Sequence, residues 1–288
     1  WVNSTGHADL VELEDGRWYM VALGIRGDEE RRSNMGRETH LIEVEWEREP
    51  YWWKEKKYLW PVAAPSTGRV ERTSLLPFAD NQHRPSLTFR DDFEQNELEL
   101  PWTFRRVPEE GAYSLISRPG FLRLYSQSTT PAARARVSQL GIKQTESDFL
   151  FTARTHFESQ STNSEAGITL FQKDDHYLNA VVKRQENGYE LNITLANRGA
   201  PSALTSKAVP EYAGIIEWQL ESAEKQYELR YRFTAESEWS LLLKMPSNKL
   251  LSQYYTGAHV GFYASSNGIP SADYMDIDWA DYRAKRRQ

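Results

Sequence analysis

Residues 9–23 read DLVELEDGRWYMVAL, and this stretch indicates a β-hairpin. Apolar and polar residues alternate over residues 9–13, as they do in a strand that buries one face. The pair Asp15-Gly16 is a preferred hairpin turn, and residues 18–23 resume as a second strand. The sequence therefore predicts an antiparallel β fold from its first elements onward.

The neighbouring sequence extends this pattern. Residues 39–46 alternate in the same way, and a further short apolar segment follows at residues 60–62. We interpret residues 1–69 as three or four antiparallel strands, which amount to one blade of a β-propeller. A lone blade cannot bury both of its faces, so the apolar faces over residues 10–23 and 41–46 predict a partner.

A linker and a second domain are predicted to follow. Residues 70–86 carry few periodic signals and contain Pro77 and Pro85, so we interpret them as a surface linker. Many short apolar segments, separated by turn residues, then fill residues 87–288. The predicted strands are residues 87–93, 102–107, 113–117, 121–125, 133–139, 149–157, 166–172, 177–183, 190–195, 215–220, 227–234, 239–244, 259–263 and 272–282. So many short strands predict an all-β protein with two packed antiparallel sheets of the jelly-roll type.

The composition excludes several classes of function. The 288 residues include no cysteine, which excludes thiol nucleophiles, cysteine-ligated zinc and disulfides. The net charge of −6 argues against nucleic acid as a partner. No apolar stretch is long enough to span a membrane and no signal peptide is present in this chain, so cytoplasmic and exported locations both stay open. The 10 Trp and 15 Tyr suit stacking on sugars, although about half of such aromatics are core residues in any β protein.

Several motifs occur in a fixed order along the chain. They are GHADLVE at residues 6–12, GRWYMV at 16–21, MGRET at 35–39, EW at 45–46 and WP at 60–61. Together they resemble the last blade of glycoside hydrolase family 43, whose β-xylosidases and α-L-arabinofuranosidases are five-bladed propellers. FRDDF at residues 89–93, Trp102 and RPGFLRL at 118–124 resemble the concanavalin A-like sandwich appended to its xylosidase branch. The resemblance implies the end of a catalytic propeller followed by a β-sandwich.

The resemblance implies roles for four residues. The family's histidine in the Gly-His-(Gly/Ala)-Asp-Leu motif lies near the floor of the active site, where it supports the catalytic carboxylates or helps hold a cation or water, and His7 matches it. The arginine of the Gly-Arg-Glu-Thr motif points at the sugar in the terminal subsite, and Arg37 matches it. A guanidinium suits this role because its fork of donors can grip two hydroxyls. An aromatic of the appended domain closes the pocket, and either Tyr254 or Tyr255 matches it, where the family more usually has Phe.

Taken alone, the same residues have simpler interpretations. An isolated histidine such as His7 is a packed residue bonded to backbone about half of the time. A salt bridge to Glu38 or Asp9 would equally explain Arg37. The joint context of the motifs is what favours a substrate site.

The resemblance also implies that the catalytic carboxylates are missing from this chain. Inverting glycoside hydrolysis needs a general acid and a general base about 6.5–9.5 Å apart, on opposite faces of the sugar. In the family both come from earlier blades, together with an aspartate that tunes the pKa of the acid. The only substitute is Asp174-Asp175, which lies in a predicted hairpin turn, where solvated turn residues are the simpler interpretation.

We therefore expect the C-terminal part of an exo-acting enzyme that removes terminal β-xylose or α-L-arabinofuranose. Its substrates would be xylo- or arabino-oligosaccharides, and it would work only beside an N-terminal propeller segment. That segment would be a companion chain or a missing part of the same chain. No catalytic cofactor is expected, and association into a homo-oligomer stays open.

A structural calcium site is a separate expectation. Asp91 and Asp92 lie at the first strand of the sandwich, and Asp278 lies in the last. If the two terminal strands are neighbours, these carboxylates would supply the hard oxygen ligands that Ca²⁺ prefers. Exposed carboxylates at strand ends are the equally weighted alternative.

Two other functions stay open. The sandwich could be a lectin-like module that binds sugars through exposed Trp and Tyr without catalysis. It could also be a passive brace for the propeller, which is compatible with the enzyme.

Overall fold

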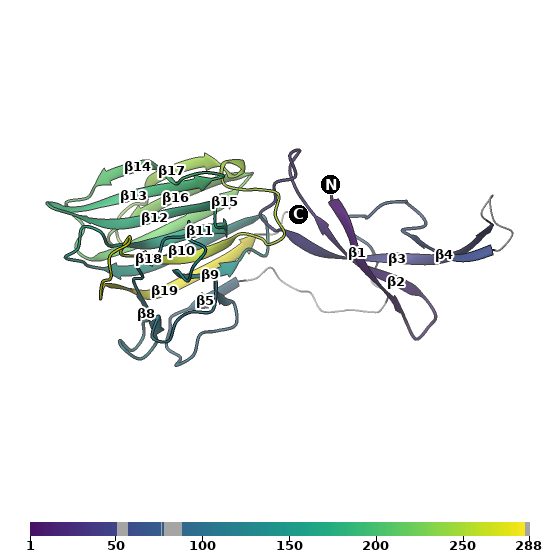
Figure 1. Ribbon diagram of the computed structural model, residues 1–288, viewed down its shortest axis with the longest axis horizontal. Coiled ribbons are helices and arrows are strands. Elements are labelled where there is room, and N and C mark those ends of the chain that lie inside the picture. The colour runs from purple at the N-terminus through teal and green to yellow at the C-terminus, as the bar shows by residue number, and fades with distance from the viewer. Residues whose placement is uncertain (51–56, 76, 78–87, 286–288) are drawn as a thin grey trace. The chain divides into compact units, whose positions relative to one another are not determined.

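The structure, a computed structural model, describes residues 1–50, 57–75, 77 and 88–285. The described residues form β-strands and connecting loops, with one short 3₁₀ turn at Ser247–Lys249. No helix in these ranges is long and apolar enough to cross a membrane. The chain divides into two compact units (Figure 1). The first comprises Trp1–Arg84 with Gln253–Tyr255, and the second comprises Pro85–Ser252 with Thr256–Gln288.

The first unit is a four-stranded antiparallel sheet whose strands lie side by side in chain order. Its strands are β1 (Asn3–Glu12), β2 (Trp18–Ile25), β3 (Arg37–Pro50) and β4 (Lys57–Ala63). The predicted Asp-Gly turn joins β1 to β2, where Gly16 adopts a left-handed φ of 82° that suits glycine.

The predicted exposed apolar surface of this sheet is present only in part. Val11 and Leu41 are 42% and 37% exposed on one face, and Leu10 is 39% exposed on the other. Tyr19, Ala22, Ile42 and Val44 are buried. The alternation along β3 thus covers one face and leaves apolar side chains in water on the other.

The second unit is a sandwich of two antiparallel sheets, seen as two layers in Figure 1. The eight-stranded sheet has the order β17 (Ser240–Pro246), β16 (Gln226–Arg232), β15 (Ile215–Ala223), β10 (Asp148–Phe157), β19 (Tyr274–Lys285), β8 (Leu122–Tyr125), β7 (Tyr113–Ser114), with β5 (Thr88–Asp91) also paired to β19. The seven-stranded sheet has the order β14 (Ser202–Ala208), β13 (Gly188–Asn197), β12 (His176–Gln185), β11 (Glu165–Lys173), β18 (His259–Ser265), β9 (Ser138–Lys143), β6 (Trp102–Phe104).

One hydrophobic core fills the space between these sheets. In β10 every second side chain is buried, as expected for a strand with one face on the core. Phe151 of β10 packs on Phe262 of β18, and Trp102 of β6 packs on the same ring. These aromatics join the two layers, because side chains from facing sheets interdigitate in a sandwich.

Several segments differ from the sequence prediction. The predicted strands 102–107 and 113–117 are too long, because β6 ends at Phe104 and β7 ends at Ser114. Strand β14 was not predicted, since six of its seven residues are exposed and it lacks apolar alternation, as an edge strand can. The predicted strand 133–139 is wrong at its start, because β9 begins at Ser138 and residues 133–137 belong to a loop. The predicted linker 70–86 lies partly outside the described residues, so its limits stay a prediction.

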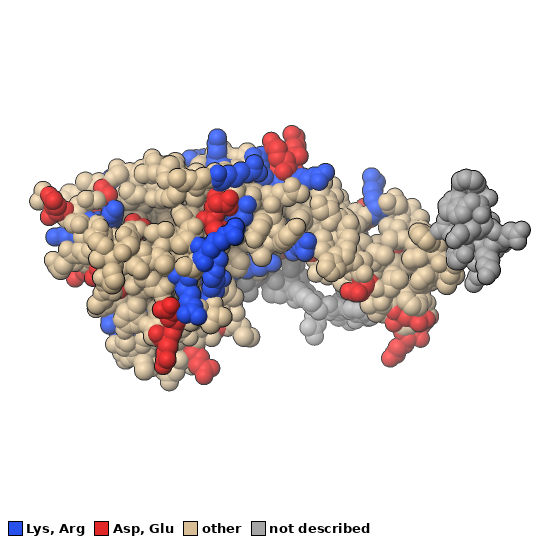
Figure 2. All heavy atoms as spheres, in the orientation of Figure 1, with Lys and Arg blue, Asp and Glu red and all other residues tan. Residues whose placement is uncertain are grey.

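Ion pairs cover the outer face of the eight-stranded sheet. Arg232 of β16 pairs with Glu217 of β15 at 2.6 Å, and Lys285 of β19 pairs with Glu221 at 2.9 Å. Figure 2 likewise shows Lys and Arg side chains interspersed with Asp and Glu on the visible face. The mixture of signs gives no single-signed field that would attract a polyanion.

Candidate functional site

The motif that contains His7 forms a doubly bulged part of β1. The pairing of β1 with β2 slips between Asn3 and Gly6, and again between Gly6 and Asp9. Each slip contains one residue with a left-handed backbone, Ser4 with φ 53° and His7 with φ 49°. Non-glycine residues rarely adopt this conformation, and bulges re-aim side chains near functional sites. The His7 side chain is exposed at its bulge.

Arg37 begins β3 directly after a tightly organised loop. The Ser33 hydroxyl accepts hydrogen bonds from the backbone N–H groups of Met35 and Gly36, both at 3.2 Å. Gly36 has a φ of 68°, a left-handed value that costs glycine little. This turn fixes the backbone at the start of β3 and so sets the place of Arg37.

His7 and Arg37 lie toward the same end of the four-stranded sheet. Gly6, next to His7, pairs with Leu23 of β2, and Arg37 pairs with Ile25 at the end of β2. One strand separates β1 from β3, so these two strands lie roughly 10 Å apart, and Arg37 lies two residues further toward the end of the sheet than Gly6. The sheet therefore brings together the two motifs that the sequence singled out.

Arg37 contacts Tyr255, which belongs to the same compact unit. The backbone N–H of Arg37 donates to the carbonyl oxygen of Tyr255 at 2.9 Å. The guanidinium carbon also lies 3.9 Å from the centroid of the Tyr255 ring, a cation–π geometry. Tyr254 stacks on Tyr255 with centroids 5.8 Å apart. Of the two tyrosines that the sequence left open, Tyr255 is the one that contacts Arg37.

The Arg37 side chain does not form a salt bridge with Glu38, which was one of its simpler interpretations. Glu38 instead accepts two hydrogen bonds from Arg26, at 2.7 and 2.6 Å. Arg37 and Glu38 are neighbours in a strand, so their side chains leave opposite faces of the sheet. Within the described residues the Arg37 guanidinium makes no hydrogen bond or ion pair, which leaves its N–H donors available to a ligand.

Sequence reasoning missed His40, which lies on the half-buried face of β3. Its ring meets Trp1 edge to face with centroids 5.7 Å apart. A Cβ at Gly24 would lie 2.8 Å from the imidazole, so the glycine makes room for the ring. Burial lowers the pKa of His40, and its Nε2 is buried without a hydrogen-bond partner among the described residues. The signal in the sequence was Gly24, because a glycine inside a strand marks a place where another group comes close to the backbone.

The three expected calcium ligands do not form one donor set. Asp91 is buried and accepts hydrogen bonds from the backbone N–H of Phe93 and from the Trp102 indole, both at 2.8 Å. Asp92 pairs with Arg90. Asp278 lies 3.6 Å from the Arg154 guanidinium. Among residues 1–50, 57–75, 77 and 88–285, no group of three or more His, Cys, Asp or Glu could hold a metal ion, so calcium stays a prediction.

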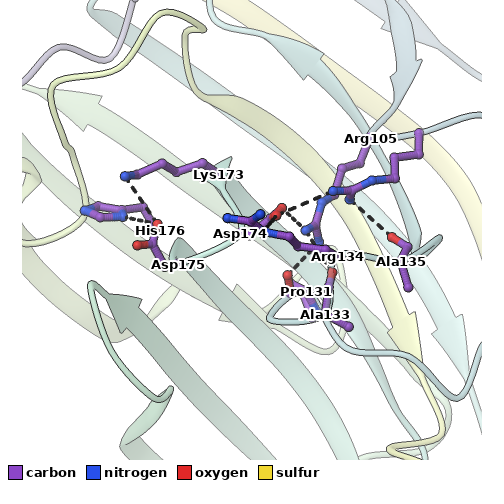
Figure 3. A network of polar contacts seen from close by, with 10 residues as sticks. Arg105, Pro131, Ala133, Arg134, Ala135, Lys173, Asp174, Asp175 and His176 are labelled. Atoms are coloured by element: carbon purple, nitrogen blue, oxygen red, sulfur yellow. Dashed lines mark hydrogen bonds and ion pairs between the residues drawn. The ribbon is translucent and has the colours of Figure 1, made fainter.

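The Asp174-Asp175 pair joins β11 to β12, as the sequence predicted, but it is not simply solvated. Asp174 pairs with Arg105, whose side chain is only 5% exposed, and with Arg106 at 3.5 Å (Figure 3). Asp175 contacts Lys173 and His176 instead. Each carboxylate has its own basic partners, which does not suit a catalytic acid–base pair.

Other buried carboxylates are also neutralised by close partners. Asp276 of β19 accepts hydrogen bonds from Arg123 at 2.7 and 2.9 Å and from Arg118 at 3.1 Å. Glu165 of β11 behaves differently, since burial raises its pKa, but the Tyr263 hydroxyl donates to it at 3.2 Å. Within the described residues, Asp276 and Glu165 therefore both have close hydrogen-bond donors.

The described residues thus form a four-stranded antiparallel sheet and a jelly-roll β-sandwich. The chain belongs to the family described as the beta xylosidase C-terminal concanavalin A-like domain, whose model matches residues 90–283. The resemblance to glycoside hydrolase family 43 is thereby confirmed, and so is the predicted fold class.

Similar proteins extend over nearly the whole chain. A non-reducing end alpha-L-arabinofuranosidase of Bacteroides ovatus is 29% identical over 96% of this chain and 51% of its own length. A xylosidase/arabinosidase of Butyrivibrio fibrisolvens is 28% identical over 96% of this chain and 52% of its own length. The solved structure titled Bacteroides ovatus Xyloglucan PUL GH43B matches with a TM-score of 0.85 and 28% identity, over 99% of this chain and 54% of that one. The chain thus spans about half the length of these relatives.

Proposed function

We propose that this chain is the C-terminal part of an inverting exo-glycosidase that removes terminal β-xylose or α-L-arabinofuranose from xylan-type oligosaccharides. The names of the relatives, an arabinofuranosidase and a xylosidase/arabinosidase, support this substrate class. The chain covers about half of each relative, which supports a catalytic acid and base on an N-terminal propeller segment.

The presentation of Arg37 carries the proposal. Its guanidinium rests on the Tyr255 ring at 3.9 Å and keeps its donors free of carboxylates in the described residues. Stacking on one face of the guanidinium holds the plane in place while the edge, which bears the N–H groups, stays open. Such an edge can donate to two neighbouring hydroxyls of a terminal sugar.

The other site residues take supporting roles in this proposal. The bulge at His7 aims an exposed imidazole from β1, two strands away from Arg37. There it supports the acid and base that the N-terminal segment supplies. The exposed apolar side chains of Val11 and Leu41, which lie on one face of the sheet, provide surface on which that segment packs, because exposed apolar area is costly in water.

The test compares this chain alone with the complete polypeptide in which the propeller segment accompanies it. We expect only the latter to hydrolyse 4-nitrophenyl β-D-xylopyranoside or 4-nitrophenyl α-L-arabinofuranoside, with the relative rates identifying the sugar. Proton NMR of the first product formed should show inverted configuration at the anomeric carbon. Activity of this chain alone as a stable monomer, or no hydrolysis of either glycoside by the complete polypeptide, would overturn the proposal.

The variants Arg37→Ala and Arg37→Lys test the role of the guanidinium in the complete polypeptide. Arg37→Ala should lower kcat/KM about 100-fold, because it removes charge-assisted hydrogen bonds to the sugar. Arg37→Lys keeps the charge but not the fork of donors, so its kcat/KM should lie between those of the alanine variant and the parent. The exposed Arg134→Ala is the matched control and should keep full activity. Unchanged kcat/KM in Arg37→Ala would remove this residue from the substrate site.

A further inference from the structure

Three arginines converge on one carboxylate at the turn between β11 and β12. Asp174 contacts Arg105 and lies 3.8 Å from Arg134 (Figure 3), and Arg106 lies 3.5 Å from the same carboxylate. Arg105 and Arg106 come directly after β6, whereas Arg134 belongs to the loop 128–137 between β8 and β9. One carboxylate balances one of the three guanidinium groups, so this group of residues carries two positive charges in excess.

The neighbouring ion pairs do not remove this excess. Lys173 pairs with Asp175 at 3.3 Å, and Arg136 of the loop pairs with Glu109 at 3.2 Å. Each of these carboxylates therefore has a cation of its own beside it. The excess around Asp174 occurs in a chain whose net charge is −6, so the general composition does not explain it.

The hydrogen bonds of Arg105 and Arg106 go to uncharged acceptors. Arg105 donates to the carbonyl oxygens of Pro131 at 2.7 Å and Ala133 at 3.1 Å, and Arg106 donates to that of Ala135 at 3.2 Å. These bonds fix the loop but leave the positive charge in place. Burial lowers the pKa of Arg105, and the charge of Arg106 acts in the same direction against the nearby carboxylate. An additional anion would relieve this repulsion.

Arg106 and Arg134 are the two arginines that a ligand can reach. The Arg105 side chain is only 5% exposed, whereas those of Arg106 and Arg134 are 36% and 90% exposed. Among the described residues the Arg134 guanidinium makes no hydrogen bond. Both accessible guanidinium groups approach the same oxygen, Oδ2 of Asp174, so they lie near enough together to bind one small ion.

The chemistry of this pair suits a phosphate group. A guanidinium binds phosphate oxygens through two parallel hydrogen bonds, and the charge on both partners strengthens them. A phosphate group carries a charge of about −1.5 to −2 at neutral pH, which matches the excess of positive charge. An extended polyanion would need a longer basic surface than these few residues provide.

We propose that Arg106 and Arg134 bind a phosphate group, as inorganic phosphate or as a phosphate ester, beside the pair of Asp174 and Arg105. Arg134 belongs to the loop 128–137 and Arg106 follows β6, so the bound phosphate holds the loop to the sandwich. The site uses none of the residues proposed for glycoside hydrolysis. Phosphate binding and hydrolysis can therefore fail independently of each other.

The first test is phosphorus NMR titration of this 288-residue chain with inorganic phosphate and with glycerol 3-phosphate, at constant ionic strength. We expect saturable binding, and tighter binding of one compound identifies the free ion or the ester as the ligand. Arg106→Ala and Arg134→Ala should each raise the Kd about fivefold, as the loss of an exposed charge-assisted contact predicts. The matched control Arg283→Ala removes an exposed arginine that pairs with Asp281 on the other sheet, and should leave the Kd unchanged.

The second test locates the bound ion. Saturating phosphate should slow amide hydrogen exchange in the loop 128–137 of the parent, and should have little effect on the same loop in Arg134→Ala. Arg134→Lys keeps the charge but not the fork of donors, so its Kd should lie between those of the parent and the alanine variant. Circular dichroism melting checks that each variant is folded.

Three results would overturn the proposal. One is that neither phosphate compound binds at constant ionic strength. Another is that Arg106→Ala and Arg134→Ala bind phosphate as tightly as the parent and the Arg283→Ala control. The third is that phosphate binds without changing hydrogen exchange in the loop 128–137, which would place the ion elsewhere on the chain.

Discussion

The guanidinium carbon of Arg37 lies 3.9 Å from the centroid of the Tyr255 ring, although the two residues are far apart in the sequence. The backbone of the same pair is joined by a hydrogen bond of 2.9 Å from Arg37 to Tyr255. Because the backbone bond needs no side chain, substitutions of Tyr255 can remove the ring contact alone. The pair therefore allows the positioning of Arg37 to be tested separately from its charge.

Tyr255→Ala in the complete polypeptide should raise KM by about 2- to 5-fold, since an exposed cation–π contact is worth about 0.5–1 kcal/mol. Tyr255→Phe should keep the parent KM, because the ring rather than the hydroxyl contacts the guanidinium. Steady-state kinetics on the better of the two nitrophenyl glycosides makes the comparison. Equal KM values for the alanine and phenylalanine variants would show that the ring does not position Arg37.

Local features of this fold could be predicted from the sequence. The hairpin around Asp15-Gly16 follows from alternation and a two-residue turn, both of which are visible over a few residues. The sandwich strands with one face on the core, such as β10, alternate clearly and were placed nearly correctly. Strand β14 was missed, because an exposed edge strand carries no hydrophobic pattern.

The candidate site could be predicted only as separate motifs. The left-handed backbone at His7 has no signature of its own, since histidine occurs in all conformations and the bulge arises from pairing with β2. The choice between Tyr254 and Tyr255 depended on which ring meets Arg37, a tertiary contact. Likewise, the hydrogen bond that Asp91 accepts from the Trp102 indole cannot be recognised from spacing.

Asp91→Ala should destabilise the sandwich by about 2–4 kcal/mol, because it leaves the buried N–H groups of Phe93 and Trp102 without an acceptor. Urea unfolding monitored by tryptophan fluorescence measures the loss, and Asp92→Ala, at an exposed ion pair, is the control with little effect. We also expect EDTA to leave the Tm of the parent unchanged. A Tm that falls in EDTA and recovers with calcium would contradict this expectation and support the predicted calcium site.

His259 should make the stability of the sandwich depend on pH. Burial lowers the pKa of His259 to about 4, and Lys143 on the paired strand acts in the same direction. The unfolded state, with an ordinary histidine pKa of about 6.5, then binds the proton first as pH falls. Stability is complete above about pH 6.5 and decreases toward pH 4, by a total on the order of 3 kcal/mol.

The variant His259→Gln isolates this contribution. Other histidines with lowered pKa values, including His156 and His176, titrate in both proteins and cancel in the difference. Urea unfolding at pH 7, 5.5 and 4.5 should give a free energy of unfolding that falls less steeply in the variant. Parallel curves for the two proteins would contradict a depressed pKa at His259.

The ion pair between Asp174 and Arg105 should hold the loop 128–137 against the sandwich. Arg105 also donates to the carbonyl oxygens of Pro131 at 2.7 Å and Ala133 at 3.1 Å, so one buried cation ties the loop to the β11–β12 turn (Figure 3). Asp174→Asn removes the charge that compensates Arg105, and breaking a buried pair in this way costs about 3 kcal/mol. We expect faster amide hydrogen exchange throughout the loop and quicker tryptic cleavage after Arg134.

The variant Arg106→Ala separates the buried pair from the outer part of the same network. Arg106 is more exposed, lies 3.5 Å from Asp174 and donates one hydrogen bond to the loop, to the carbonyl oxygen of Ala135 at 3.2 Å, so its loss should cost only about 1 kcal/mol. Hydrogen exchange in the loop should then stay close to that of the parent protein. If both variants loosened the loop equally, the loop would be held by the network as a whole, and the burial of Arg105 would have no special role.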